Sequence, residues 1–100
     1  MPTKELTEQA EWLAALGEPT RLSLLCVLAT GQMTVTQLAS AIQVEIVNVS
    51  HHLGLLKAVG LVTSERDGRH MLYSLSGAKA TAVALELSHG SGVKVSIPLV

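Results

Sequence analysis

The sequence predicts a mainly α-helical domain that carries one small β-hairpin. Two observations support this fold class. Apolar residues recur at intervals of three and four over most of residues 4–58, which is the period of amphipathic helices. The period changes to two on either side of Asp67-Gly68, a dipeptide typical of tight hairpin turns. A chain of 100 residues is long enough for a single domain, 1–100, with its own core.

The first two helices are expected within residues 1–31. Apolar residues at helical spacing predict the first helix over 4–16, and Gly17 ends it. Pro19 suits the first turn of a second helix at about 19–30, because its fixed φ fits that position. This second helix is apolar nearly all round, which indicates a central, buried helix.

A helix-turn-helix is expected over residues 33–59. Thr34 and Gln37 have the spacing of a capping box, which predicts that a short helix starts there. Residues 42–44 leave room only for a tight turn before a longer helix at about 45–58. Two packed helices joined by a short turn therefore precede the hairpin.

The hairpin, or wing, is expected over 61–75, and a last helix over 77–88. In the tail, 89–100, apolar side chains alternate at Val93, Val95 and Ile97. This alternation predicts a strand, which would add to a sheet or pair across a dimer. The alternative is a tail that frays in solvent.

The composition bears on oligomeric state and on several function classes. Hydrophobic residues make up 48% of the chain and charged residues 15%, so part of the surface is expected to be covered in an oligomer. Two aromatic residues, Trp12 and Tyr73, are too few for a single-strand nucleic-acid platform. The single Cys26 excludes an internal disulfide, and its apolar helix favours a buried, inert thiol over a redox switch. No membrane span or signal peptide is apparent, so a cytoplasmic protein is expected.

The net charge of −1 argues weakly against nucleic-acid binding until the charges are placed along the chain. Residues 1–18 hold one lysine and four glutamates, whereas basic side chains slightly outnumber acidic ones in 19–100. The acidic part is therefore separate from the helix-turn-helix and the hairpin.

A helix-turn-helix followed by a hairpin suits double-stranded DNA. The second helix fits the major groove, where its N-terminal half meets base edges, and the hairpin lies alongside. The side chains expected to read bases are small or short and polar: Val47, Asn48, Ser50 and His51. The side chains expected to hold phosphates are basic: Lys57, Arg66 and Arg69.

Neither a catalytic site nor a metal or cofactor site is expected. Ser50 and His51 are neighbours on one helix, where nucleophile and base cannot easily meet, and no carboxylate orients the histidine. His51 and His52 point about 100° apart on a helix, so a shared metal ion is disfavoured. One of the two is expected to face DNA and the other to be packed and hydrogen-bonded.

Four short motifs follow one another in a fixed order and spacing within residues 14–75. They are Ala-Leu-Gly-Glu-Pro-Thr-Arg-Leu at 15–22, Val-Ser-His-His-Leu at 49–53, Leu-Lys-Ala-Val-Gly-Leu-Val at 56–62, and Arg-Asp-Gly-Arg at 66–69 followed by Tyr-Ser-Leu at 73–75. Together they resemble the ArsR/SmtB family of dimeric winged helix-turn-helix transcriptional repressors. The resemblance implies a homodimer built from the first helix and the last helix, 77–88, which represses transcription from a palindromic operator.

The metal sites of this family are missing from the sequence. The thiolate sensors carry Cys-Val-Cys at the start of the helix-turn-helix, where this chain has Thr34-Val35-Thr36, and hydroxyls do not replace thiolates for soft metals. The zinc sensors use Asp and His in the last helix, and 77–88 contains neither. No inducer is therefore predicted.

The first turn of the expected recognition helix, Glu45-Ile46-Val47, departs from the polar residues usual in the family. The glutamate would repel phosphates, and Ile46 or Val47 could instead meet a thymine methyl. Two alternatives therefore stay open. One is a winged-helix protein-interaction module without DNA binding. The other is a metal- or redox-responsive regulator whose site lies outside the family positions.

Overall fold

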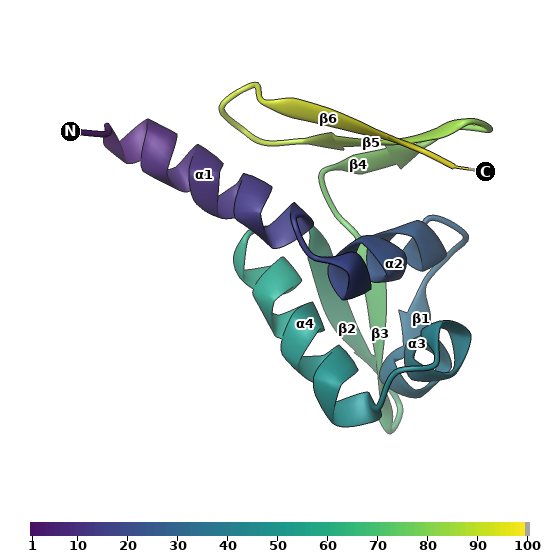
Figure 1. Cartoon of the computed structure of the whole chain (residues 1–100). Coiled ribbons are helices and arrows are strands. Elements are labelled where there is room, and N and C mark those ends of the chain that lie inside the picture. The colour runs from purple at the N-terminus through teal and green to yellow at the C-terminus, as the bar shows by residue number, and fades with distance from the viewer. Residues whose placement is uncertain (100) are drawn as a thin grey trace.

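The computed structural model describes residues 1–99, which form four helices and two three-stranded antiparallel sheets (Figure 1). In chain order the elements are α1 (Lys4–Leu16), α2 (Pro19–Leu28), β1 (Met33–Thr34), α3 (Val35–Ile42), α4 (Ile46–Ala58), β2 (Val62–Asp67), β3 (His70–Leu75), β4 (Ala78–Ala80), β5 (Ala84–Ser88) and β6 (Lys94–Pro98). The fold class predicted from the sequence, helical with a winged helix-turn-helix, is confirmed.

The helices begin and end at local signals, and the predictions for α1 to α4 are confirmed to within two residues. The Thr3 hydroxyl accepts a hydrogen bond from the N–H of Leu6 at the start of α1. Thr34 and Gln37 form both halves of the capping box at the start of α3. Gln43 adopts a left-handed conformation, with φ of 55°, and turns the chain from α3 into α4.

The predicted hairpin is present as part of a sheet with the strand order β1-β3-β2. β2 and β3 pair up to Asp67 opposite His70, so the turn lies where Asp67-Gly68 predicted it. The third strand, β1, was not predicted, because two residues are too short to show a period. It pairs Met33 with Tyr73 and thereby fixes the start of α3 against the wing.

The predicted helix at 77–88 is wrong, because this segment forms β4 and β5 in a second sheet with the order β4-β5-β6. On a helix Leu85 and Leu87 would point about 160° apart, toward nearly opposite faces. On β5 both are fully buried, and Glu86 between them is exposed. The period of two prevails over the helix propensity of the alanines, so the C-terminal dimer helix implied by the resemblance is absent from residues 1–99.

The strand predicted in the tail is confirmed, and its partner is β5 of the same chain. Ile97 lies opposite Leu85, and Val95 lies opposite Leu87. These four side chains make one apolar face that packs on the core, whereas Lys94 is exposed on the other face. The apolar face of β6 is therefore covered within the same chain, without a strand from a second chain.

The second sheet holds α1 through a small cluster at the β5–β6 turn. Trp12 of α1 is only 2% exposed, and its ring meets that of His89 edge-to-face at 5.7 Å between centroids. The Gln9 Nε2 atom donates a hydrogen bond to Ser91 Oγ at 2.9 Å. The side chain of Trp12 thus belongs to the core of this chain.

Cys26 is half-buried, so the expected buried thiol is only partly correct. It lines an apolar pocket between the end of α2 and strands β4 and β6, together with Val27, Thr81 and Leu99. Within residues 1–99, no helix has the length and apolar character needed to cross a membrane.

Candidate nucleic-acid interface

One end of the molecule brings together the start of α4, the turn between β2 and β3, and α3 (Figure 1). The sheet β4-β5-β6 lies at the opposite end. The elements that the sequence predicts for DNA contact are therefore neighbours in space, and the C-terminal sheet stands clear of them.

The packing of α4 defines which of its side chains face outward. Val49, Leu53 and Leu56 are 0% exposed and anchor α4 on the core, as the sequence predicts. The expected base-reading side chains are all exposed on the remaining surface: Val47, Asn48, Ser50 and His51. The structure thus leaves these four side chains free for a partner.

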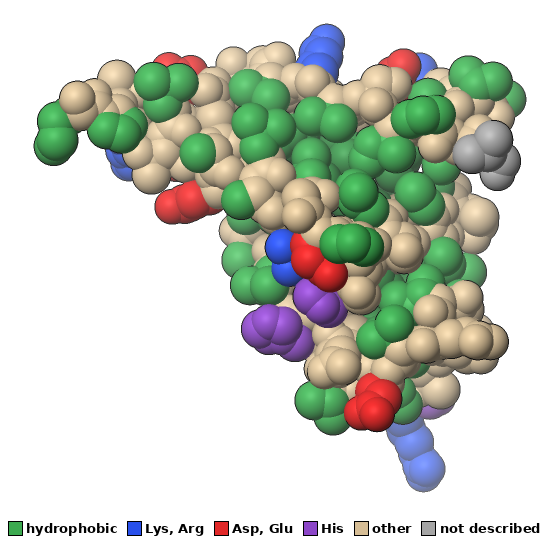
Figure 2. Space-filling view, in the orientation of Figure 1, with side chains coloured by type: hydrophobic (Ala, Val, Ile, Leu, Met, Phe, Trp, Pro, Cys, Tyr) green, Lys and Arg blue, Asp and Glu red, His purple; other side chains and the backbone are tan. Residues whose placement is uncertain are grey.

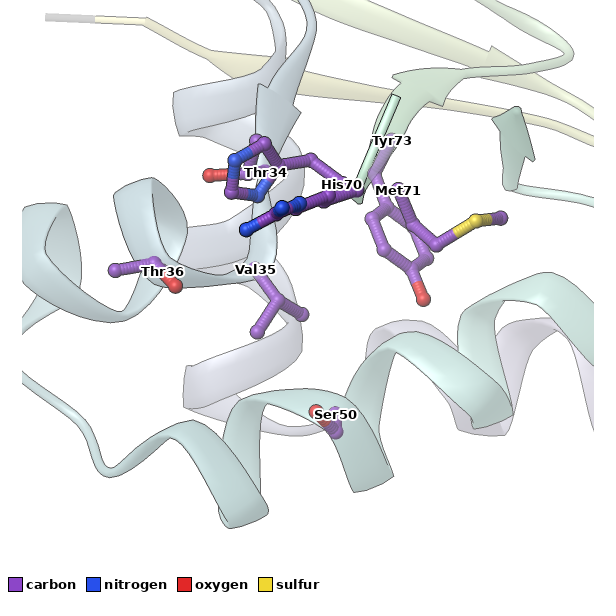
Figure 3. A pocket seen from close by; sticks show the side chains of 8 residues that line it. Thr34, Val35, Thr36, Ser50, His70, Met71 and Tyr73 are labelled. Atoms are coloured by element: carbon purple, nitrogen blue, oxygen red, sulfur yellow. The ribbon is translucent and has the colours of Figure 1, made fainter. Parts of the chain in front are cut away.

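Ser50 lies at the edge of a cavity of about 290 Å³ between α3, α4 and the wing (Figure 3). The start of α3 contributes residues 34–36, and the wing contributes residues 69–71 and Tyr73. Tyr73 and Val35 point toward α4 in Figure 3. The sequence alone did not predict that Tyr73, Thr36 and His70 line one cavity, because only the pairing of β1 with β3 brings the wing beside the start of α3.

The three expected phosphate-holding side chains differ in their surroundings. Lys57 Nζ donates a hydrogen bond to Ser64 Oγ of β2 at 2.7 Å, so this side chain reaches toward the wing strand. Arg66 is exposed near the end of β2, and Arg69 is exposed at the wing turn. Only Arg69 lines the cavity together with Ser50. The two arginines are therefore available at the end of the molecule, and Lys57 lies farther along α4.

The two histidines of α4 have different surroundings, as the sequence predicts. His51 is exposed, and the His52 side chain is 18% exposed. Arg21 Nη1 lies 3.1 Å from His52 Nδ1, which accepts this hydrogen bond when its proton is on Nε2. Glu18 Oε2 lies 3.7 Å from the same nitrogen. Figure 2 shows basic, acidic and histidine side chains meeting at this junction of α1, α2 and α4.

Arg21 also joins α1 to this cluster. Its Nε donates to the carbonyl oxygen of Ala15 at 2.6 Å, and its Nη2 donates to that of Ala14 at 3.4 Å. Both carbonyl groups belong to the last turn of α1, where that of Ala14 also accepts a hydrogen bond from the backbone N–H of Gly17 at 3.0 Å. Arg21 therefore positions α4 relative to α1 through His52.

Glu18 is the N-cap of α2. Its carboxylate accepts a hydrogen bond from the backbone N–H of Arg21 at 2.9 Å. This hydrogen bond is the main cause that holds the pKa of Glu18 below its ordinary value; burial opposes it less strongly, and the backbone N–H of Thr20 and the nearby His52 add still smaller lowering effects. Glu18 is thus stabilised as the carboxylate at the start of α2.

The described part of the chain holds no cluster of metal-ligating side chains. No group of three or more His, Cys, Asp and Glu side chains within residues 1–99 is arranged to hold a metal ion. The rings of His51 and His52 lie edge-to-face at 5.5 Å between centroids.

A helix-turn-helix whose second helix is flanked by a β-hairpin defines the class of winged helix-turn-helix proteins. Residues 18–64 match the model of the arsR family of bacterial regulatory proteins. The chain belongs to this family, which is one of transcription regulators rather than enzymes.

Two relatives and one solved structure illustrate the similarity. The transcriptional repressor SmtB of Mycobacterium tuberculosis is 38% identical over 86 residues, which are 85% of this chain and 64% of SmtB. The biofilm growth-associated repressor of Xylella fastidiosa is 35% identical over 77% of this chain and 68% of its own length. A homodimeric winged helix-turn-helix DNA-binding domain from Mycobacterium bovis is 33% identical, with a TM-score of 0.69 over 72% of this chain and 67% of that domain. The chain thus spans slightly less than two thirds of the mycobacterial SmtB.

Proposed function

We propose that this protein is a transcriptional repressor that binds double-stranded DNA as a homodimer at a palindromic operator, in the cytoplasm. The observation that carries this proposal is the exposed face of α4 beside the wing turn. Asn48, Ser50 and His51 supply hydrogen-bonding groups there, and Arg66 and Arg69 supply positive charge. The sequence similarity to SmtB and to the biofilm growth-associated repressor supports the same function.

The base-reading and phosphate-holding roles follow from this geometry. Asn48 and His51 lie on the exposed surface of α4 and would meet base edges in the major groove, with Ser50 and Val47 beside them. Arg66 and Arg69 would contact phosphates next to the groove. Lys57 would have to break its hydrogen bond with Ser64 to contact a phosphate. Otherwise it holds β2 in place through that hydrogen bond.

The second protomer is expected at α1. Leu6 and Leu13 are 56% and 43% exposed, and with Ala10 they form an apolar stripe at helical spacing. Such a stripe is self-complementary when two copies of α1 meet about a two-fold axis. The two copies of α4 would then lie about 34 Å apart, one turn of DNA, to match the two halves of a palindrome.

The experiment that tests the proposal starts from a library of randomised duplexes of about 30 bp, which is long enough for two half-sites one helical turn apart. Duplexes are selected with the full chain, and their affinity is measured by fluorescence anisotropy at two salt concentrations. A palindromic consensus that binds at least about 1,000-fold more tightly than a scrambled duplex supports a sequence-specific repressor. Binding without a consensus, or no binding, overturns it.

One observation favours a second candidate, a winged-helix module that binds another protein. Ile46 and Val47 at the start of α4 are apolar and are 48% and 76% exposed. Exposed apolar side chains of this kind are common at protein interfaces. The same selection separates the two functions, because an interaction module enriches no DNA sequence.

A further inference from the structure

The first turn of the expected recognition helix, α4, exposes an apolar side chain. Val47 is 76% exposed in the first turn of α4, whereas Val49, two residues on, is fully buried. We propose that Val47 recognises the 5-methyl group of a thymine in each half of the operator. This inference rests on the proposed function and assigns one specificity determinant to it.

The orientation of Val47 follows from the packing of α4. The buried side chains Val49, Leu53 and Leu56 define the inward face. At 100° per residue, Val47 and His51 lie near the middle of the opposite face, one turn apart. Val47 therefore points directly away from the core, at the end of α4 that lies beside the wing turn (Figure 1).

Neither packing nor helix formation accounts for a valine at this position. Its side chain is outside the apolar core, and β-branched residues are weaker helix formers than alanine or leucine. The N-cap, Glu45, makes no side-chain hydrogen bond at this end of the helix, and the side chain of Val47 has no polar atom that could cap a backbone group. The exposed methyl groups are therefore free to serve a partner.

An apolar side chain such as that of valine is complementary to one group in the major groove, the methyl group of thymine. The side chain has no donor or acceptor, so it cannot pair with the polar edges of guanine, adenine or cytosine. The only apolar group on the floor of the major groove is the methyl of thymine. Valine has one strongly preferred rotamer in a helix, so it presents its methyl groups in a fixed direction.

The neighbours of Val47 complement this contact. Asn48 and His51 are exposed beside it and can form the hydrogen bonds that set the register on the bases. Removal of one buried methyl contact is expected to weaken binding about four-fold per half-site, and about sixteen-fold when both half-sites are changed.

The test replaces thymines by deoxyuridine, one symmetric pair at a time, in the duplex selected above. This change removes only the methyl group and keeps every hydrogen-bonding edge. Dissociation constants are measured by fluorescence anisotropy for the wild-type chain and for Val47→Ser. Because Val47 is exposed, the variant is expected to fold, and circular dichroism checks this. Val83→Ser is the matched control, since Val83 is 70% exposed between β4 and β5.

The expected result is one thymine pair whose replacement weakens wild-type and Val83→Ser binding about sixteen-fold and leaves Val47→Ser binding nearly unchanged. The inference is overturned if no thymine pair is sensitive. It is also overturned if the sensitivity persists in Val47→Ser or disappears instead in Ile46→Ser. In these cases the duplex is still bound and the repressor proposal stands. If no duplex is selected at all, the proposed function fails and this inference fails with it.

Discussion

Arg21 Nη1 lies 3.1 Å from Nδ1 of His52, and this contact joins the start of α2 to the middle of α4. The same guanidinium group donates to carbonyl oxygens in the last turn of α1. A planar group with five donors can serve these separate acceptors at once. The position of the expected recognition helix, α4, relative to α1 therefore depends on the side chain of Arg21, which does not itself face the DNA-binding end.

Replacement of Arg21 by methionine is expected to lower the free energy of unfolding by about 1–3 kcal/mol. Methionine keeps much of the aliphatic packing but leaves the carbonyl of Ala15 and the ring nitrogen of His52 without their donor. Urea denaturation followed by circular dichroism measures the change. The control is Lys79→Met, at an exposed position of β4. Equal stability losses in the two variants would show that the hydrogen bonds of Arg21 contribute little.

Glu18 is expected to make stability depend on pH on the acidic side. The N–H of Arg21 lowers the pKa of the folded-state carboxylate below the ordinary value of 4.5. The stabilisation is therefore complete above about pH 4.5 and is lost as the pH falls through the lower, folded-state pKa. Urea denaturation between about pH 3 and pH 6 measures this loss.

Glu18→Gln keeps an acceptor for Arg21 but removes the titrating group. Its unfolding free energy is expected to vary less with pH, so that the advantage of the wild type shrinks as the solution is acidified. Glu86→Gln, at an exposed position of β5, is the control and is expected to follow the wild-type profile. An unchanged profile for Glu18→Gln would contradict the role assigned to the N-cap.

Gly54 lies within α4, where glycine lowers the stability of a helix relative to alanine. It is exposed in the middle of the helix, and beyond the local backbone of α4 no atom lies within 4 Å of the place that a Cβ would take. Gly54→Ala is therefore expected to raise the free energy of unfolding by about 0.5–1 kcal/mol, because alanine loses less backbone entropy in a helix. Thermal and urea denaturation measure the gain.

Gly68→Ala is the matched control for this substitution. Gly68 has a φ of 61° in the wing turn, where alanine is strained although nothing lies within 4 Å of its Cβ. This variant is expected to be less stable than the wild type. If Gly54→Ala also lost stability, α4 would not be an ordinary exposed helix at that position.

The sequence predicted the parts of the fold that depend on local patterns. Thr34 and Gln37 mark the start of α3, and Asp67-Gly68 marks the wing turn, because each acts on residues only a few positions away. Residues 77–88 were mispredicted because the strand state of Leu85 and Leu87 depends on pairing with β6 farther along the chain. Local helix propensity carries no information on that pairing.

In the candidate site, too, the sequence predicted what depends on local spacing and missed what depends on long-range pairing. The exposed face of α4 follows from the spacing of Val49, Leu53 and Leu56, which the sequence displays. The position of Tyr73 beside the start of α3 depends on the pairing of Met33 with Tyr73, between residues far apart in the chain. The cavity beside Ser50 therefore could be found only in the folded structure.

Arg69→Ala is expected to weaken binding to specific and scrambled duplexes by similar factors. Arg69 is exposed at the wing turn, where it would neutralise a phosphate rather than read a base. The slope of log K against log salt should decrease by about 0.9 for each protomer. Lys94→Ala, on β6 at the opposite end of the molecule, is the control. An unchanged salt slope for Arg69→Ala would exclude a phosphate contact by this side chain.

The second protomer is expected to contact the apolar stripe of α1. Leu13 is 43% exposed on the apolar stripe of α1, in a helix that already carries Glu5, Glu8 and Glu11. Leu13→Glu is expected to raise the dimer dissociation constant at least tenfold, since a two-fold axis places two added charges in an apolar contact. Sedimentation velocity over a range of concentrations measures this constant, and circular dichroism checks that the helices remain.

Val83→Glu is the control for the dimer, because Val83 is equally apolar and 70% exposed but lies between β4 and β5. It is expected to dimerise like the wild type. If Val83→Glu dissociated the dimer and Leu13→Glu did not, the protomers would meet through the C-terminal sheet. That result would mean that β4-β5-β6 has taken over the contact that the family resemblance assigned to a last helix. Because only α1 presents an exposed leucine stripe within residues 1–99, we expect the opposite result.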